Sequence, residues 1–540
     1  MRYYRCFFSG ALIAASTLIS VSSTASDDFT PRHRIAFSET VSPITLKKLG
    51  TYDSGLIDES AAEIVAHDPR SQRVFVTNAK DSSVDVLSIY NPRRPHKLFS
   101  LDLSAYGEPN SVAVNKGIVA VAVAANDVGV EGKVVFFNRH GRLLNALDVG
   151  FLPDMLTFSP DGKTLVVANE GEPNDDYTID PEGTVSIISI QKPIKKMTRA
   201  DVKTADFTAF NSQTLDDSVR IFGPNASVAQ DVEPEYVAIS DDSQTAYVAL
   251  QENNAYAIVD LPSAQVTDIV GLGVKSFDSI YSAMDASDKD DAVAIQPWPV
   301  KGFYQPDSIA SYTVDGETYL VTANEGDARD YDGYSEEVRV DDLILDPSLL
   351  ARFPSLQDED QLGRLKTTTA NGDLDNDGDV DQIFAYGGRS FSIFNANTGE
   401  LVFDSGADFA RITANLSAEL FNANDKRSDD KGAEPEALTI GKVGKRTYAF
   451  IGLERTGGVM IYDITRPETS HFVHYANNSL LDGDVDAGTA GDVAPEGFAF
   501  ISAKHSPIRQ PLLVVANEVS GTTTLYAIET VADRRWKGRR

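Results

Sequence analysis

The stretch KGAEPEALTIGKVGKRTYAFIGLERTGGVMIYDI, from Lys431 to Ile464, contains three short apolar segments separated by a Gly/Lys turn and a Gly-Gly turn. Segments of this length between glycine turns are typical of β-strands joined as hairpins. The stretch opens with Glu434-Pro435-Glu436, and its second segment ends at Glu454. Three such strands in sequence make up most of one blade of a β-propeller.

The same order of features recurs along the chain. One copy reads DVEPEYVAISDDSQTAYVALQENNAYAIVDL, and another reads FLPDMLTFSPDGKTLVVANEGE. A self-similar unit of this kind indicates a repeat architecture. The sequence therefore predicts an all-β fold, a seven-bladed β-propeller of the YVTN/WD40-like type over residues 44–530. The copies begin at Ala61, Gly107, Phe151, Asp231, Tyr304, Lys431 and Val493.

Two features set the limits of this propeller. The last copy has only three strand segments, whereas ITLKKLGTY at residues 44–52 precedes every copy. We expect this N-terminal strand to complete the last blade and close the ring, which leaves only short, protected sheet edges. The fifth copy is interrupted by a long insertion at about residues 326–384.

The N-terminus predicts export from the cytoplasm. Arg2 and Arg5 precede an apolar run at residues 7–21, which is followed by small residues and is too short for a confident membrane span. Cys6 is the only cysteine and lies before this run, so we expect a mature chain with no thiol and no disulfide. The terminal segments predicted are a signal peptide at 1–25, a linker at 26–43 and a basic tail at 531–540.

The composition favours cations as partners. The 540 residues carry a formal net charge of −32, so nucleic acid and anionic lipid are poor partners. Much of this charge also keeps a secreted protein soluble. With 42% hydrophobic residues the chain can bury a large core, and we expect a monomer.

Connectivity predicts an acidic mouth to the central channel. Strands in a blade alternate in direction, so the loop before the first strand and the loop between the second and third strands share one face. Carboxylates gathered there repel one another unless cations or hydrogen-bond donors neutralise them. The alternative is that each acid caps a strand by accepting backbone hydrogen bonds. The entering loops contribute Glu63, Asn110, Asp154, Glu235, Asp307, Glu436 and Glu496. The expected ligands of a divalent metal are Glu235, Asp307, Glu436 and Glu496.

A second cation site is predicted inside the insertion. Oxygen-bearing residues at alternate positions, with Gly378 at the sixth, match a Ca²⁺-binding loop over residues 373–381. The twelfth position is Phe384, so this is a short DxDxDGxxD loop and not an EF-hand. The alternative is a solvated acidic loop. The candidate ligands are Asp373, Asp375, Asp377, Asp379 and Asp381.

Recognised nucleophile motifs are missing from the chain. There is no G-x-S-x-G, H-E-x-x-H, glycine-rich phosphate loop or C-x-x-C. A few arginines lie near the predicted mouth, where they could orient a phosphate or carboxylate beside a metal ion. The alternative is that each pairs with a neighbouring acid. The candidate catalytic residues are Arg329, Arg389, Arg455 and Glu436.

Several long strings resemble the choice-of-anchor I family of secreted β-propellers, which includes the mesenchyme-specific cell-surface glycoprotein type. The resemblance runs from about residue 44 to residue 529 and implies an extracytoplasmic propeller, with some members labelled alkaline phosphatase-like and others resembling adhesion proteins. Because no apolar segment follows residue 529, we expect a periplasmic or released protein. The strings are VANEGEPNDDY, DPEGTVSII, TANEGDARDYDGYSEEVRV, YGGRSFSIF, SDDKGAEPEALTIG and AFIGLERTGGVMIYDIT.

These observations lead to two hypotheses. The first is a calcium-binding propeller that acts as a metal-dependent phosphoesterase, in which a metal-bound water attacks a small phosphorylated ligand. The second is a non-enzymatic binding or adhesion propeller, rigidified by calcium, that binds an anionic ligand, a surface protein or a glycan. A third reading, a purely structural propeller, predicts no effect of calcium beyond residues 373–381. Fold alone does not decide among them.

Overall fold

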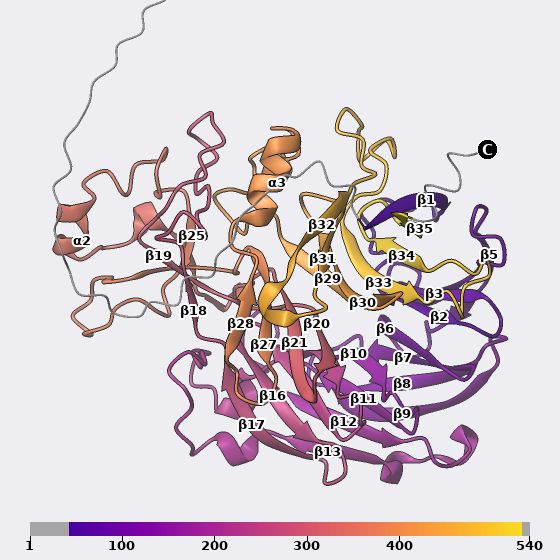
Figure 1. Cartoon of the computed structure of the whole chain (residues 1–540). Coiled ribbons are helices and arrows are strands. Elements are labelled where there is room, and N and C mark those ends of the chain that lie inside the picture. The colour runs from indigo at the N-terminus through magenta and orange to yellow at the C-terminus, as the bar shows by residue number, and fades with distance from the viewer. Residues whose placement is uncertain (1–42, 532–540) are drawn as a thin grey trace, which may run out of the picture. The chain divides into compact units, whose positions relative to one another are not determined.

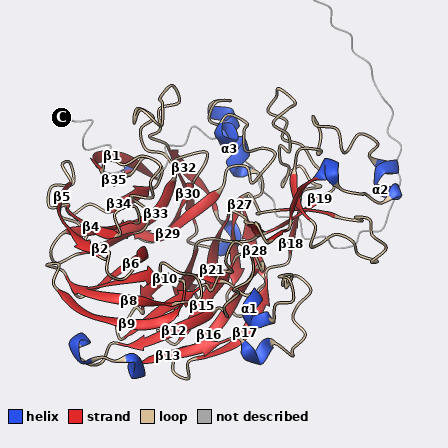
Figure 2. Ribbon diagram, turned by 180° about the vertical axis from the view of Figure 1, so that it is seen from behind, coloured by secondary structure: helices blue, strands red, loops and turns tan. Residues whose placement is uncertain are grey.

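Seven four-stranded antiparallel sheets make up most of the chain in a computed structural model, which describes residues 43–531 (Figure 1). The view from behind shows that strands far outnumber helical turns (Figure 2). In chain order, the first four sheets contain β2–β5 (Val65–Asp68, Arg73–Asn78, Ser83–Ser88, His96–Asp102), β6–β9 (Glu108–Asn115, Ile118–Ala124, Glu131–Asn138, Leu143–Phe151), β10–β13 (Pro153–Phe158, Thr164–Asn169, Thr184–Ser189, Val202–Asp206) and β14–β17 (Pro234–Ile239, Thr245–Leu250, Ala255–Asp260, Gln265–Gly271). The fifth and sixth sheets contain β20, β21, β27 and β28 (Ile309–Val314, Glu317–Asn324, Ser390–Asn395, Leu401–Asp404) and β29–β32 (Pro435–Val443, Arg446–Leu453, Val459–Asp463, His471–Ala476). The seventh sheet contains β33–β35 together with β1 (Pro495–Ile501, Leu512–Asn517, Thr522–Thr530, Ile44–Asp53).

The first strands of the seven sheets contact one another in a closed cycle. Strand β2 contacts β6, and the contacts continue through β10, β14, β20, β29 and β33 back to β2. Sheets that share a ring of inner strands form a β-propeller. The repeats found in the sequence are therefore the units of this ring.

The ring closes through the N-terminal strand, as the sequence predicts. Strand β1 pairs antiparallel with β35, in a register that runs from Ile44 opposite Thr530 to Asp53 opposite Thr522. The first and last described strands thus share one sheet. This pairing satisfies backbone groups that the last sheet would otherwise expose at an edge.

Apolar side chains fill the spaces between neighbouring sheets. Val74 and Leu87 of the first sheet, for example, pack in one cluster with Leu512 and Val514 of the last. All are buried, and each fully buried aliphatic side chain contributes about 1.5–3 kcal/mol. The inner strands are accordingly held by contacts on both faces of each sheet.

Two inserted segments form a separate layer with its own core. Residues 272–308 join β17 to β20, and residues 325–389 join β21 to β27. The sequence predicts only the second of these insertions. Their shared core includes Trp298, Leu349 and Leu362. Strands of this layer are β18 (Val274–Ser276), β19 (Val300–Phe303), β22 (Asp330–Tyr331), β23 (Tyr334–Ser335), β24 (Glu337–Arg339), β25 (Lys366–Thr368) and β26 (Ile383–Ala385), and its helices are η4 (Val340–Asp342) and α2 (Pro347–Arg352).

The remaining helical elements are short and lie in loops. They are η1 (Ile194–Lys196), η2 (Arg199–Asp201), η3 (Thr208–Phe210), α1 (Val228–Asp231), α3 (Asp408–Leu416), η5 (Phe421–Ala423) and η6 (Pro467–Thr469). Within residues 43–531, no helix is both long and apolar enough to cross a membrane. The predicted signal peptide at 1–25, and nearly all of the predicted linker at 26–43 and basic tail at 531–540, lie outside the described residues.

Candidate functional site

A proline followed by a carboxylate opens most of the inner strands. In four sheets the structure pairs this proline with the last residue of the second strand, for example Pro435 with Leu453 and Pro495 with Asn517. Proline lacks an N–H group and suits the first residue of a strand. The acid after the proline and the residue that follows the second strand then lie diagonally across the pair on one face of the sheet, and the latter is Glu454 or Glu518 in these two sheets.

The first group of carboxylates contains Asp307, Glu325 and Glu436. One oxygen of each lies within 4.8 Å of the others. Glu436 Oε2 is buried and has no hydrogen-bond partner. Lys431 Nζ lies 2.8 Å from Glu325 Oε1. Three carboxylates and one ammonium group leave an excess of negative charge at this point.

The second group contains Glu63, Glu496 and Glu518, again within 4.8 Å of one another. Ser60 Oγ donates to Glu518 Oε1 at 3.0 Å, whereas Glu496 Oε2 is buried without a partner. In each group two acids come from one sheet, one before its first strand and one after its second. The third comes from the start of the next sheet, so the two groups are equivalent positions of the repeat.

The pKa values of these acids are raised. Burial, followed by the charge of Glu325, raises the pKa of Asp307 to about 8. Burial, followed by Glu518, raises the pKa of Glu63 to about 8. Burial and neighbouring carboxylates also hold the pKa of Glu436 and of Glu496 well above the usual range. Close acids in this environment either keep protons or bind cations, and a hard divalent cation takes several carboxylate oxygens at once.

The four predicted mouth ligands are divided by the structure. Asp307 and Glu436 belong to the first group and Glu496 to the second, whereas Glu235 belongs to neither. The position after the second strand of its sheet is occupied by Gln251, whose Nε2 donates to Glu325 Oε2 at 3.3 Å. Because Gln251 is an amide where Glu454 and Glu518 are carboxylates, the position beside Glu235 offers one carboxylate ligand fewer.

The asparagines that precede the loop acids hold the turns. Asn324 Nδ2 donates to Ser392 Oγ at 2.7 Å, and Asn169 Nδ2 donates to Ser186 Oγ at 3.0 Å. Within residues 43–531, neither Glu436 nor Glu496 accepts a backbone N–H. One buried oxygen of each acid, Oε2, therefore remains without a hydrogen-bond partner among the described residues.

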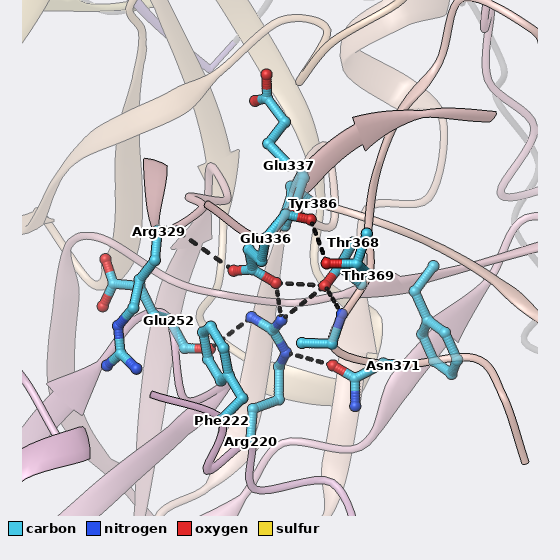
Figure 3. Close-up of polar contacts among 12 residues, drawn as sticks. Arg220, Phe222, Glu252, Arg329, Glu336, Glu337, Thr368, Thr369, Asn371 and Tyr386 are labelled. Carbon is cyan, nitrogen blue, oxygen red and sulfur yellow. Dashed lines mark hydrogen bonds and ion pairs between the residues drawn. The ribbon is translucent and has the colours of Figure 1, made fainter. Parts of the chain in front are cut away.

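Arg329 lies in a buried polar network that clamps the insertion to the fourth sheet (Figure 3). Its side chain is fully buried, with Nη1 2.5 Å from Asp231 Oδ1 and Nη2 3.1 Å from Glu233 Oε2. Its backbone N–H donates to Glu336. A guanidinium bound in this way has a structural role, so the predicted phosphate contact from Arg329 has no room in this arrangement.

The centre of the same network is Arg220, which sequence reasoning missed because nothing in the local pattern marks it. Its guanidinium carbon lies 4.1 Å from the ring centre of Phe222 and 4.5 Å from that of Phe303. Arg220 forms an ion pair with Glu336 and donates from Nε to Asn371 at 2.9 Å (Figure 3). Aromatic and carboxylate partners together satisfy this buried cation.

The other two predicted arginines occupy different surroundings. Arg389 is buried and donates from Nη1 to the carbonyl of Asp285 at 2.7 Å and from Nη2 to that of Ser428 at 3.1 Å. Burial lowers the pKa of Arg389 to about 10. The side chain of Arg455 is 48% exposed, and its Nε lies 2.9 Å from Glu454. Of the three, Arg455 alone is open to a ligand.

The predicted calcium loop turns tightly at Gly378, whose φ of +99° is a left-handed conformation. Oxygens of Asp373, Asp375 and Asp381 lie within 4.8 Å of one another, and Asp379 and Asp381 form another such group with Asp346. Asp346 caps α2 and was not predicted. Asp377 belongs to neither group; its Oδ1 accepts from the Asp379 N–H at 3.2 Å.

Comparison with known proteins gives one family match and two named relatives. Residues 63–467 match the choice-of-anchor I domain. Gigasin-3a from Magallana gigas is 32% identical over 194 residues, which cover 33% of this chain and 68% of that protein. The mesenchyme-specific cell surface glycoprotein from Strongylocentrotus purpuratus is 28% identical over 261 residues, covering 41% of this chain. The match spans 33% of that glycoprotein.

Among solved structures, Kuenenia stuttgartiensis hydrazine synthase matches with a TM-score of 0.47 and 14% identity over 88% of this chain and 99% of the matched chain. The Neurospora crassa Pan2 WD40 domain matches with a TM-score of 0.44 and 9% identity, over 90% of this chain and 96% of that domain. The β-propeller assignment therefore rests on the strand pairing and the cycle of inner strands.

Proposed function

The chain belongs to the choice-of-anchor I family, and from this premise we propose that it is an extracytoplasmic seven-bladed propeller of the YVTN/WD40-like type whose mouth binds calcium or another hard divalent cation. One observation carries the proposal. Two equivalent carboxylate groups each contain a buried oxygen with no hydrogen-bond partner, on Glu436 and on Glu496. Such an oxygen is costly unless a ligand reaches it. Calcium takes six to eight oxygen ligands, so each group supplies part of a shell that water or a ligand completes.

The proposed role of these cations is to bind an anionic ligand at the mouth. A cation held by protein carboxylates keeps open positions for the oxygens of a phosphate, a carboxylate or a glycan. Arg455 is the exposed arginine beside the mouth acids, where it can contact such a ligand. The loop at residues 373–381 supplies a further calcium site that rigidifies the insertion. Export and a surface or periplasmic location fit the name of the cell surface glycoprotein relative.

The second candidate function is metal-dependent hydrolysis of phosphoesters. It is favoured by Lys431, whose ammonium group lies 2.8 Å from Glu325 in the first carboxylate group. A metal ion there would activate water, and Lys431 with Arg455 would neutralise a phosphate. Arg329 and Arg389 take no direct part in this version, since both side chains are buried and bound to protein groups.

Calcium titration of the purified protein by calorimetry tests the first proposal. Glu436→Gln and Glu496→Gln are each expected to lower the number of bound calcium ions or to weaken one class of site at least tenfold. Glu400→Gln, on an exposed residue outside the mouth, is the matched control and should leave the titration unchanged. Equal calcium binding by all four proteins would exclude the mouth as the site.

Hydrolysis separates the two candidates. The protein is incubated with p-nitrophenyl phosphate and bis(p-nitrophenyl) phosphate from pH 6 to 10, with chelator and then with calcium restored. Activity that depends on calcium and is lost in Glu436→Gln supports the phosphoesterase. Calcium binding without turnover of either compound supports the binding propeller.

A further inference from the structure

We propose that a groove in the inserted layer binds an acidic sugar. The groove has a volume of about 310 Å³ and lies between strand β19, the end of helix α2 and the two residues that precede β26. This size is at the small end of the range for organic ligands, which suits a ligand of one or two rings. None of the six mouth carboxylates lines the groove, so the proposal is independent of cation binding at the mouth. The groove shares one acid, Asp381, with the proposed calcium loop, so the binding tests are run both in chelator and with calcium.

Two cations in this groove have no carboxylate partner. Lys301 Nζ donates to Ser276 Oγ at 3.0 Å, and the Arg352 guanidinium carbon lies 5.4 Å from the ring centre of Phe353. Within residues 43–531, no carboxylate forms an ion pair with either one. Two such cations that line one groove complement an acid group on a ligand.

Other cations of the same layer show the contrast. Arg339 lies 2.7 Å from Asp429, and Lys366 lies 2.9 Å from Glu337. Arg364 lies 3.1 Å from Asp429. Carboxylates are therefore available in this layer and pair with these three cations. Lys301 and Arg352 differ because they line the groove.

The floor of the groove is apolar and firmly held. Trp298 is buried in the core of the layer, and its Nε1 donates to the carbonyl of Met284 at 3.2 Å. Leu349 and Phe353, at the end of α2, complete this surface. A pyranose ring has one face made of C–H groups, which can pack on aromatic and aliphatic side chains and leave water.

Two carboxylates in the groove select a ligand with hydroxyl groups. Asp278 and Asp381 line the groove together with Ser276 and Gln382. A small inorganic anion would be repelled by the two carboxylates. Sugar hydroxyls instead donate hydrogen bonds to them, while the acid group of the same sugar accepts from Lys301 or Arg352. The combination therefore favours a polyhydroxylated acid, carrying either a carboxylate or a sulfate.

Saturation-transfer NMR and calorimetry with the full mature protein test this inference. The probes are glucuronate, N-acetylglucosamine 6-sulfate, glucose and inorganic phosphate. At least one acidic sugar should bind, and glucose and phosphate should bind at least tenfold more weakly. Lys301→Met and Arg352→Met should each weaken binding of the acidic sugar about 10- to 100-fold, the range for a hydrogen bond to a charged group.

Lys442→Met, on an exposed lysine of β29, is the matched control and should bind like the unaltered protein. Thermal unfolding checks that each variant is folded. The proposal is overturned if neither acidic sugar binds, if glucose or phosphate binds equally well, or if folded variants at both positions keep full affinity. Preference for glucuronate over the sulfated sugar, or the reverse, identifies the acid group.

Discussion

Replacing Arg329 by methionine should destabilise the protein strongly, although a phosphate-binding role would predict little change. The guanidinium pairs with Asp231 and Glu233, and the three side chains are 0–2% exposed. Removing one partner of a buried ion pair costs about 3–5 kcal/mol because the remaining charges stay buried and uncompensated. For a cooperative unit of roughly 490 residues, unfolding entropy of about 1 kcal/mol per degree converts this into a fall in Tm of about 3–5 °C.

Arg455→Met is the comparison variant, because the Arg455 side chain is 48% exposed and its charge is screened by water, although its partner Glu454 is 8% exposed. Exposed pairs contribute about 0–1 kcal/mol, which corresponds to a Tm change of at most about 1 °C. Thermal unfolding followed by circular dichroism measures both variants. Adding Asp231→Asn and Glu233→Gln to Arg329→Met should recover part of the loss, since no buried charge then remains unpaired. An Arg329→Met variant within 1 °C of the unaltered protein, or one no worse than Arg455→Met, would refute the structural assignment.

Three further predictions concern pH, closure and the calcium loop. In the presence of chelator, the free energy of unfolding should fall as the pH rises from about 4 to about 8. The reason is that Glu63 and Asp307 ionise near pH 4 when unfolded but have pKa values of about 8 when folded. Denaturant titrations in which the free energy of unfolding rises with pH over this window would contradict the prediction. Deleting residues 43–53 removes β1 and exposes β35, so size-exclusion chromatography should show aggregates, and a stable monomer would argue against closure. Asp375→Asn should remove one bound calcium ion in calorimetry and leave the mouth sites intact, whereas an unchanged stoichiometry would exclude the loop.

The ring and its closure could be predicted because they depend on local patterns that repeat. Strand alternation, glycine turns and the unpaired segment at residues 44–52 all lie close together in sequence, and the pairing of β1 with β35 follows from the missing fourth strand. The entry acids could also be assigned to one face from connectivity alone. The sequence could not show which of these entry acids lie close together, because that depends on the distances between neighbouring sheets.

The inserted layer could not be predicted for a different reason. Its sheet joins β19 to β26 in parallel, with Val300 opposite Ile383, so its partners come from separate insertions. Arg220 and Glu336 meet in the same way, from positions far apart in the chain. No periodic pattern marks such pairs, because each is decided by packing against a neighbouring sheet. For the same reason the sequence could not distinguish Arg329, Arg389 and Arg455. In the structure Arg329 and Arg389 are buried, whereas the side chain of Arg455 is 48% exposed.

Two positions of the repeat explain where the carboxylate groups arise. Each group has an acid at the entry to the first strand, another after the second strand and a third at the start of the next sheet. This set of acids is not sufficient, because Asp154, Glu170 and Glu235 provide it at the third sheet and are absent from the groups whose oxygens lie within 4.8 Å of one another. Gln251 breaks this pattern at the fourth sheet. The sixth sheet also has acids at these positions, but the Arg455 Nε lies 2.9 Å from Glu454 and partly neutralises the charge that would otherwise attract a metal cation. The two carboxylate groups differ in what reaches the loop acid: Lys431 Nζ lies 2.8 Å from Glu325, whereas Ser60 Oγ donates to Glu518. We therefore expect the second group, which has no such ammonium group among the described residues, to bind a divalent cation more tightly than the first.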